Sequence, residues 1–276
     1  MIKAAVITGA SGGFGAEIAA LFAADGHNLV LVARSSQNLE ALADSLERAH
    51  GVQAIAAPLD LTIPSAPDVL YAEIQRRGIQ CTALVNNADA GPAGPFIEID
   101  LARELAVLHL NVLALTHLTK LLARQMAPHG GKILNVASTA AFQAGPFRAV
   151  TSAAQAYVLS FSEALSEELR PLGISVTALC PGPARAGAEE TAGSRRARPS
   201  ARVDLSAAEV ARAGYLGMMR GRPLVIPGFR NRVLALAVRA VPRAAAARMA
   251  LRLSHEPPFP PEGAEAPSGH STQIDI

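Results

Sequence analysis

The chain of 276 residues is poor in several residue types: it has no tryptophan, two cysteines, three lysines and three tyrosines, and 17% of its residues are charged. Two cysteines are too few for a disulfide scaffold and fit a reducing compartment. Half of the residues are hydrophobic, which excludes an intrinsically disordered chain. No uninterrupted apolar run approaches about 18 residues, and the N-terminus lacks the layout of a signal peptide. We therefore expect a cytoplasmic protein without a membrane span.

Charge is unevenly distributed along the chain, although the net charge is only +2. Residues 210–255 contain nine arginines and no acid, whereas residues 256–276 contain four acids, five prolines and no base. The segment 229–253 predicts two helices separated at Pro242, packed on the core or on a partner subunit. Peripheral contact of this segment with an anionic membrane is the alternative. Residues 256–276 predict a disordered tail. Nucleic-acid binding is not expected, because aromatic residues are scarce and no recognised motif is present.

Short apolar runs alternate with helical patterns as far as about residue 226. The apolar runs predict buried strands at 4–7, 28–32, 54–56, 83–85, 133–136, 175–179 and 223–226. Helical periodicity lies near 14–24, 37–50, 66–77, 98–127, 152–170 and 206–220. Continuous apolar strands joined by helices predict an α/β fold, namely a Rossmann-like doubly wound parallel sheet of about seven strands with a C-terminal helical extension. The loop 181–205 has the length of a segment that covers a ligand.

A glycine-rich turn follows the first predicted strand and leads directly into a helix. Its candidate cofactor-binding residues are Thr8, Gly9, Ser11, Gly13, Phe14 and Gly15. Glycines let the backbone approach a pyrophosphate, and the helix N-terminus offers free N–H groups and a positive dipole end to phosphates. The turn therefore predicts a dinucleotide-binding domain over residues 1–227, followed by the arginine-rich helical extension 228–255 and the tail.

The end of the second predicted strand indicates which dinucleotide is bound. Ala33 stands where a carboxylate would hydrogen-bond a ribose 2′-hydroxyl, and Arg34 follows it. Because a guanidinium suits a phosphate, NADP is favoured over NAD. The alternative is that Arg34 is a solvated charge at the end of a strand.

The glycine spacing resembles the Thr-Gly-x-x-x-Gly-x-Gly pattern of the short-chain dehydrogenase/reductase (SDR) family. Other positions match too, over about residues 3–227: Asp60 and Leu61, Asn86, Asn87 and Ala88, Asn111, Ser138, and Pro181 and Gly182. The resemblance implies an oxidoreductase that binds a small carbonyl or alcohol substrate, with Asp60, Leu61, Asn87, Ala88, Pro181 and Gly182 among its cofactor-binding residues. It also implies a homo-oligomer, a dimer or tetramer formed through the helices at 98–127 and 152–170.

The chain departs from this family where the family has its catalytic Tyr-x-x-x-Lys pair. Thr151 and Gln155 stand at those two positions, whereas the family's serine and asparagine are matched by Ser138 and Asn111. Tyr157 is no substitute, because six residues of helix turn it about 120° away from the Thr151 face. A threonine hydroxyl can donate a hydrogen bond but has no useful acidity. The expected loss is the contribution of general acid–base catalysis, about 10²–10⁴-fold in rate.

Four other polar residues are weaker candidates for the site. Asp89 replaces a family glycine and is either a turn residue or a new catalytic acid. Arg148 could face the substrate, whereas His109 and His117 fit packed or interfacial positions. No metal site is expected, because Cys81 and Cys180 lack metal-ligand spacing and no zinc or haem motif is present.

Three functions remain open from the sequence. The first is NADP-dependent hydride transfer in which Ser138 and Thr151 polarise a carbonyl, while Asn111 holds a water and that water or Asp89 supplies the proton. The second is a catalytically impaired protein that binds a cofactor or ligand. The third is a non-redox enzyme, such as a cyclase, lyase or dehydratase, built on the same scaffold.

Overall fold

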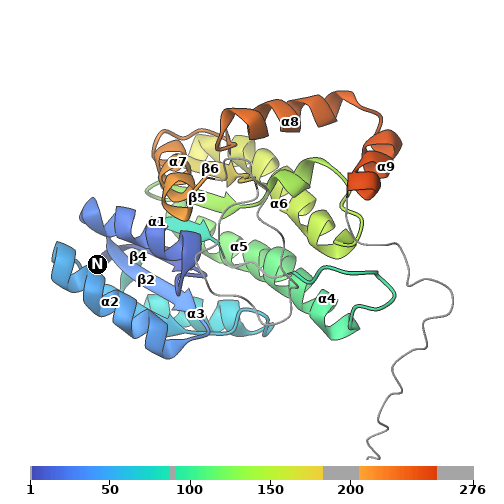
Figure 1. Ribbon diagram of the computed structural model, residues 1–276. Coiled ribbons are helices and arrows are strands. Elements are labelled where there is room, and N and C mark those ends of the chain that lie inside the picture. Colours follow the sequence, from blue (N-terminus) through green and yellow to red (C-terminus); the bar gives the residue numbers. More distant parts are fainter. Residues whose placement is uncertain (1, 88–90, 183–204, 254–276) are drawn as a thin grey trace, which may run out of the picture.

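A computed structural model describes residues 2–87, 91–182 and 205–253 (Figure 1). Within these residues, seven strands form one parallel sheet in the order β3-β2-β1-β4-β5-β6-β7. The strands are β1 (Ile2–Thr8), β2 (Asn28–Ala33), β3 (Ala54–Pro58), β4 (Ile79–Asn86), β5 (Gly131–Val136), β6 (Ile174–Leu179) and β7 (Leu224–Val225). The predicted doubly wound sheet is confirmed, because the strand order reverses between β1 and β4.

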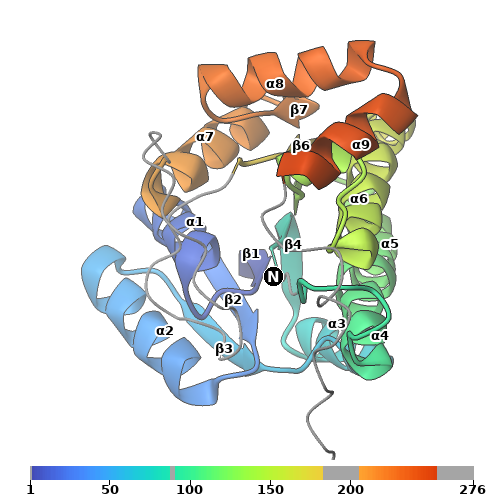
Figure 2. The same ribbon diagram turned by 45° about the vertical axis from the view of Figure 1, so that its right-hand side comes forward.

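Helices cover both faces of the sheet (Figure 2). One face carries α1 (Gly13–Ala24), α2 (Ser36–His50) and α7 (Ala207–Met219). The other carries α3 (Ala66–Arg76), α4 (Leu101–Leu108), α5 (Leu115–Met126) and α6 (Ala149–Glu168). Short helical turns lie at η2 (Thr139–Phe142) and η3 (Arg170–Leu172). The continuous cover explains why the strands are apolar on both sides.

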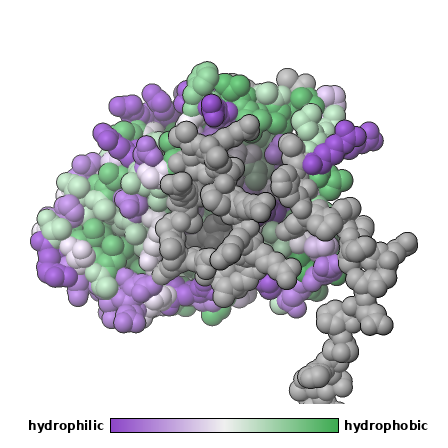
Figure 3. Space-filling model, in the orientation of Figure 1, coloured by the Kyte–Doolittle hydropathy of each residue, from purple (hydrophilic) through white to green (hydrophobic). Residues whose placement is uncertain are grey.

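The C-terminal extension forms α8 (Phe229–Ala240) and α9 (Arg243–Leu253), so the predicted break at Pro242 is confirmed. Both helices lie at the top of Figures 1 and 2, on the side of β6 and β7. Hydrophobic and hydrophilic residues stand side by side on this part of the surface (Figure 3). The predicted disordered tail, most of the loop 181–205, Ala88 and Asp89 lie outside the described residues.

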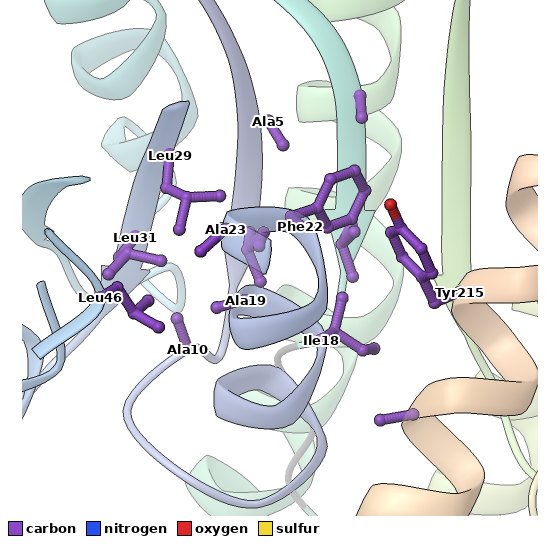
Figure 4. Close-up of a cluster of buried hydrophobic side chains, with 14 of the residues drawn as sticks. Ala5, Ala10, Ile18, Ala19, Phe22, Ala23, Leu29, Leu31, Leu46 and Tyr215 are labelled. Carbon is purple, nitrogen blue, oxygen red and sulfur yellow. The ribbon is translucent and has the colours of Figure 1, made fainter. Parts of the chain in front are cut away.

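Side chains of β1 alternate between two hydrophobic clusters. Ala5 and Ile7 face the cluster under α1, α2 and α7, whereas Ala4 and Val6 face the cluster under α3 and α5. Phe22 of α1 is central to the first cluster and meets the ring of Tyr215 edge-on, with 4.9 Å between ring centroids (Figure 4). Packing on both faces of the sheet fixes the position of β1, and therefore the position of the turn that follows it.

A buried polar network joins the centre of the sheet to its helices. Asn86 donates through Nδ2 to Asn135 Oδ1 at 2.8 Å and to Thr119 Oγ1 at 3.0 Å. Asn135 in turn donates to Ser162 Oγ at 2.9 Å, and Ser162 donates to the Val158 carbonyl at 2.6 Å. These bonds connect β4 and β5 to α5 and α6 directly below the carboxyl ends of the strands.

The helix predicted as one unit at 98–127 contains a π-helical turn, η1 (His109–Ala114), between α4 and α5. Such wide turns often lie at functional sites, and this one carries Asn111. Within the described residues, the stretch Leu101–Met126 is long and apolar enough to cross a membrane. Its inner side packs on β4, as the core helix of a globular domain does.

Candidate functional site

A cleft of about 970 Å³ lies at the carboxyl ends of the strands, where the strand order reverses. Open α/β sheets bind ligands at this place. Of the predicted residues, Gly9, Ser11, Phe14, Arg34, Asp60, Leu61, Asn87, Ser138, Pro181 and Gly182 line the cleft. Among residues that the sequence reading missed, Ser35, Asn38, Thr62, Ala106 and Leu110 line it as well. Ser35 and Asn38 could have been foreseen, because they open the helix after β2.

The glycine turn is shaped for close approach of a ligand to the backbone. Gly9 and Gly13 have φ of 63° and 54°, in the left-handed region that favours glycine. A Cβ at Gly15 would lie 2.1 Å from the Gly9 carbonyl oxygen. The N-cap of α1 is Gly12, which forms no side-chain cap with the N–H groups of the first turn. The residues present therefore fit the pyrophosphate of a dinucleotide.

Thr8 and Asn87 hold the turn against β4. The Asn87 backbone N–H donates to Thr8 Oγ1 at 3.0 Å, and its Nδ2 donates to the Gly9 carbonyl at 3.1 Å. The Thr8 hydroxyl donates to the Val85 carbonyl at 3.3 Å. Thr8, Gly13 and Gly15 do not line the cleft themselves, so their contribution is to shape the turn.

Polar groups from the ends of β2 and β3 line another part of the cleft. Arg34 is exposed there, and Ser35 caps α2 by accepting a hydrogen bond from the Asn38 N–H at 3.4 Å. Asp60 accepts hydrogen bonds from the Thr62 N–H at 2.9 Å and the Thr62 hydroxyl at 2.7 Å. Burial alone would raise the pKa of Asp60, but these bonds and the charge of Arg34 hold it below its ordinary value. The two hydrogen bonds from Thr62 therefore hold the Asp60 carboxylate in place.

The four predicted catalytic residues lie on neighbouring elements. Ser138 lines the cleft and accepts a hydrogen bond from the Ala140 N–H at 3.1 Å. Thr151 is half-buried in the first turn of α6, Gln155 is buried one turn later, and Asn111 is buried in η1. Because α6 packs on both η1 and η2, all four share one region. Only Ser138 reaches the cleft wall.

The segment after β4 passes directly against the start of α6. A Cβ at Gly91 would lie 2.4 Å from Thr151 Oγ1. The Gly94 N–H donates to the Phe147 carbonyl at 2.8 Å, and Phe147 has a φ of 62°, unusual for a residue with a side chain. The sequence reading missed this contact, because it joins segments about 60 residues apart. The space beside Thr151 is consequently filled by backbone.

The three tyrosines and three lysines of the chain all lie in the described residues, and none of them lines the cleft. The Tyr157 hydroxyl pairs with Thr116 Oγ1 at 2.7 Å, which confirms that this phenol points elsewhere. Lys132 donates to the Met219 carbonyl at 3.1 Å. Tyr215 donates to Asp25 at 2.5 Å; burial and this carboxylate raise the pKa of Tyr215.

The remaining polar candidates do not line the cleft. Arg148 is exposed at the N-cap of α6, His109 is half-buried, and His117 Nε2 lies 3.1 Å from Asp68 Oδ1. Burial raises the pKa of Cys81 to about 12, so this thiol is unreactive. Among the described residues no group of three or more potential ligands could hold a metal ion. A second, apolar cavity of about 550 Å³ lies between α3 and β3 and contains no predicted site residue.

The chain belongs to the short-chain dehydrogenase family: the family model described as "short chain dehydrogenase" matches residues 3–197. The seven-stranded parallel sheet with helices on both faces agrees with this family membership.

Individual relatives are reductases and dehydrogenases. The chain is 33% identical over 181 residues to the ketoacyl reductase HetN of Nostoc sp.. This alignment covers 65% of the present chain and 63% of HetN. It is 31% identical over 181 residues to 17-beta-hydroxysteroid dehydrogenase type 3 of Rattus norvegicus, covering 64% of this chain and 58% of that protein. The matches thus span less than two thirds of these relatives' lengths.

A solved short-chain dehydrogenase from Sphingobium yanoikuyae, in complex with NADPH, superimposes with a TM-score of 0.77 at 30% identity, covering 97% of this chain and 99% of that one. The bulky-bulky ketone specific alcohol dehydrogenase from Comamonas testosteroni superimposes with a TM-score of 0.74 at 27% identity, covering 97% and 98%.

Proposed function

We propose that this protein binds NADP(H) and transfers hydride between this cofactor and a small carbonyl or alcohol substrate. The observation that carries the proposal is the cleft itself, which joins the glycine turn, Arg34 and Ser138 in one cavity. The NADPH complex of the Sphingobium relative and the ketoacyl reductase relatives support it.

The cofactor would be held by several groups of this chain. Arg34, Ser35 and Asn38 offer a guanidinium, a hydroxyl and an amide for the 2′-phosphate, and β2 ends in Ala33 rather than a carboxylate. We assign NADP rather than NAD on this basis. Residues 1–227 form the cofactor domain in this proposal, and Ala88 remains a proposed contact.

The proposed chemistry relies on hydrogen bonding rather than on a strong acid. The bound cofactor supplies the hydride. Ser138, on the cleft wall, would polarise the substrate oxygen. Thr151 would act on the same oxygen, Asn111 would hold a water that supplies the proton, and Gln155 would hydrogen-bond the nicotinamide ribose. Because these three residues do not line the cleft, this proposal requires the cleft to widen towards α6 when the ligands bind. Because no tyrosine–lysine pair is present, we expect turnover about 10²–10⁴-fold below that of a site with a positioned acid.

NADPH titration tests the cofactor assignment. The chain has no tryptophan, so the emission of NADPH itself is the signal. We expect NADPH to bind more tightly than NADH, and Arg34→Ala to weaken NADPH by about 10–100-fold while leaving NADH unchanged, since a charge-assisted bond is lost. Arg48→Ala, an exposed arginine at the other end of α2, is the control. Failure of NADPH to bind at millimolar concentration would refute the proposal.

Back-substitution tests the catalytic part. The double variant Thr151→Tyr with Gln155→Lys should raise ketone reduction by about 10²-fold or more. Gly91 crowds Thr151, so the melting temperature of the variant is measured alongside to show that it folds. If NADPH binds but neither protein reduces any ketone in a panel, hydride transfer is wrong. A binding role or a non-redox lyase-type activity would then take its place.

We also infer a homo-oligomer formed through α4, α5 and α6. Large apolar side chains are exposed on α4, on the π-helical turn η1 that joins it to α5, and on α6, namely Leu101, Leu105, Leu113 and Tyr157. Burying such a patch is favourable in proportion to its apolar area. Analytical ultracentrifugation should show a dimer or tetramer, and a monomer at micromolar concentration would contradict the inference.

A further inference from the structure

Helix α8 carries large apolar side chains on the side that faces away from the protein. Ala235 is buried with Ile226 in the cluster below the helix. Val233 precedes Ala235 by two residues, about 200° around the helix, and Phe229 lies one turn before Val233 on the same stripe. Phe229 is 80% exposed, Val233 48% and the neighbouring Leu234 57%. A helix whose only partner were the core would bury these side chains.

Arginines border this stripe on both sides. Arg230 and Arg232 are exposed and lie within about 100° of Phe229 on opposite sides of it. In α9, Arg248 and Arg252 share the exposed face opposite the buried Ala246. Among the described residues, none of these four arginines forms an ion pair, because the salt bridges involve other side chains.

The C-terminal part of the chain carries a net positive charge. Residues 210–255 contain nine arginines and no acid, and the 21 residues that follow contain four acids, so the combined stretch keeps a surplus of five positive charges. Hydrophobic and hydrophilic residues both lie on the upper part of the surface in Figure 3, where α8 runs in Figure 1. A two-fold contact between copies through α8 and α9 would set this arginine-rich surface against itself, which like-charge repulsion opposes.

We propose that α8 and α9 dock the protein reversibly on an anionic lipid surface. Phe229 and Val233 enter the boundary between headgroups and acyl chains, while the arginines extend to the lipid phosphates. Combined apolar burial and attraction to anionic lipid is the mode by which basic amphipathic helices bind a membrane without crossing it. The proposal does not depend on the catalytic activity.

The inner side of α8 allows docking to be separated from cofactor binding. Asn231 lies on that side, donates to the Pro227 carbonyl at 2.8 Å, and packs on Gly182, where a Cβ would lie 2.5 Å from its Nδ2. Gly182 lines the cofactor cleft. Variants of the outward side chains leave this contact in place, so they should change lipid binding without changing NADPH affinity.

Vesicle flotation of the full chain tests the proposal. We expect binding to vesicles of equal parts phosphatidylcholine and phosphatidylglycerol, and no binding to vesicles of phosphatidylcholine alone. Salt at 1 M should release the protein, because the Debye length is then only about 3 Å. Arg230→Glu with Arg232→Glu should weaken partitioning by roughly 30-fold or more, from the attraction of each basic residue to anionic lipid. Phe229→Ser with Val233→Ser should weaken it independently.

The matched control is Arg48→Glu with Arg170→Glu, which reverses two exposed arginines on α2 and η3. This control should bind vesicles like the wild type, and all variants should keep the wild-type melting temperature. Equal binding to neutral vesicles, no vesicle binding at all, or an equal loss in the control would each overturn the proposal. So would a change in sedimentation caused by Phe229→Ser with Val233→Ser, which would assign the surface to a second copy of the chain.

Discussion

Gly15 provides the sharpest test of the cofactor cleft, because the structure leaves no room for a side chain there. A methyl group at this position would lie 2.1 Å from the Gly9 carbonyl oxygen and 2.8 Å from Asn87 Nδ2. The first of these neighbours is backbone, so Gly15→Ala fits only if α1 moves away from the turn. The bond from Asn87 to the Gly9 carbonyl would be disturbed by the same movement.

Overpacking of a well-packed site costs about 1–3 kcal/mol in the free energy of unfolding. For a protein of this size each kcal/mol lowers the melting temperature by about 2–4 °C. The turn that must move lines the cleft, so NADPH affinity should fall by at least about tenfold, which corresponds to about 1.4 kcal/mol. The variant should therefore lose both stability and cofactor affinity.

Gly51→Ala is the matched control, because Gly51 has a φ of 70° at the C-cap of α2 and open space around it. This variant should lose about 1 kcal/mol through left-handed backbone strain and keep its NADPH affinity. Thermal melts by circular dichroism and NADPH emission titration measure the two effects. If Gly15→Ala binds NADPH as tightly as Gly51→Ala does, the glycine turn is not the cofactor cradle.

Three further predictions concern stability. Asn135→Ala removes the centre of the buried polar network and should cost about 2–4 kcal/mol in urea unfolding, since two partners lose a hydrogen bond; a cost below about 1 kcal/mol would contradict this. Tyr215→Phe should cost about 1–2 kcal/mol by the same assay, and in alkaline titration of the wild type, Tyr215, held by Asp25, should ionise last. The pKa of Asp60 is lowered from 3.8, so the hydrogen bonds that it accepts from Thr62 stabilise the fold above that pH, and this stabilisation is lost as the pH falls further. The melting temperature of Asp60→Asn should therefore fall less steeply below pH 3.8 than that of the wild type. An unchanged pH dependence would refute the assignment.

Local patterns were enough to predict the elements of the sheet. Each predicted strand was found, and most helix ends lie within a few residues of the expected positions. The main differences are tertiary. Helix α6 begins at Ala149 rather than 152, which brings Thr151 into its first turn, and the π-helical turn at Asn111 interrupts a regular helical pattern. Hydrophobic periodicity does not report either feature, because both depend on how the helices pack against neighbouring segments.

The candidate site was predicted only in part. Positions that follow a strand, such as Gly9, Asp60 and Ser138, could be placed because the carboxyl ends of parallel strands meet at one edge of the sheet. Ser35 and Asn38 were missed, although their place at the start of the helix after β2 could have been recognised from the sequence. The contact of Gly91 with Thr151 was missed because no local spacing relates the two.

The sequence alone determined the order of strands and helices, the glycine turn, and the threonine and glutamine that stand where a catalytic tyrosine and lysine were expected. These depend on residue identity and on spacing along one segment. The tertiary structure decided that no tyrosine or lysine lines the cleft. Tyr157 is hydrogen-bonded to Thr116 instead, and Lys132 donates to the Met219 carbonyl. The tertiary structure also decided that α8 turns Phe229 and Val233 outward while Ala235 packs inward. The physical reason is that burial is shared among segments distant in sequence, so which face of a helix meets the core is settled only when all of them pack together.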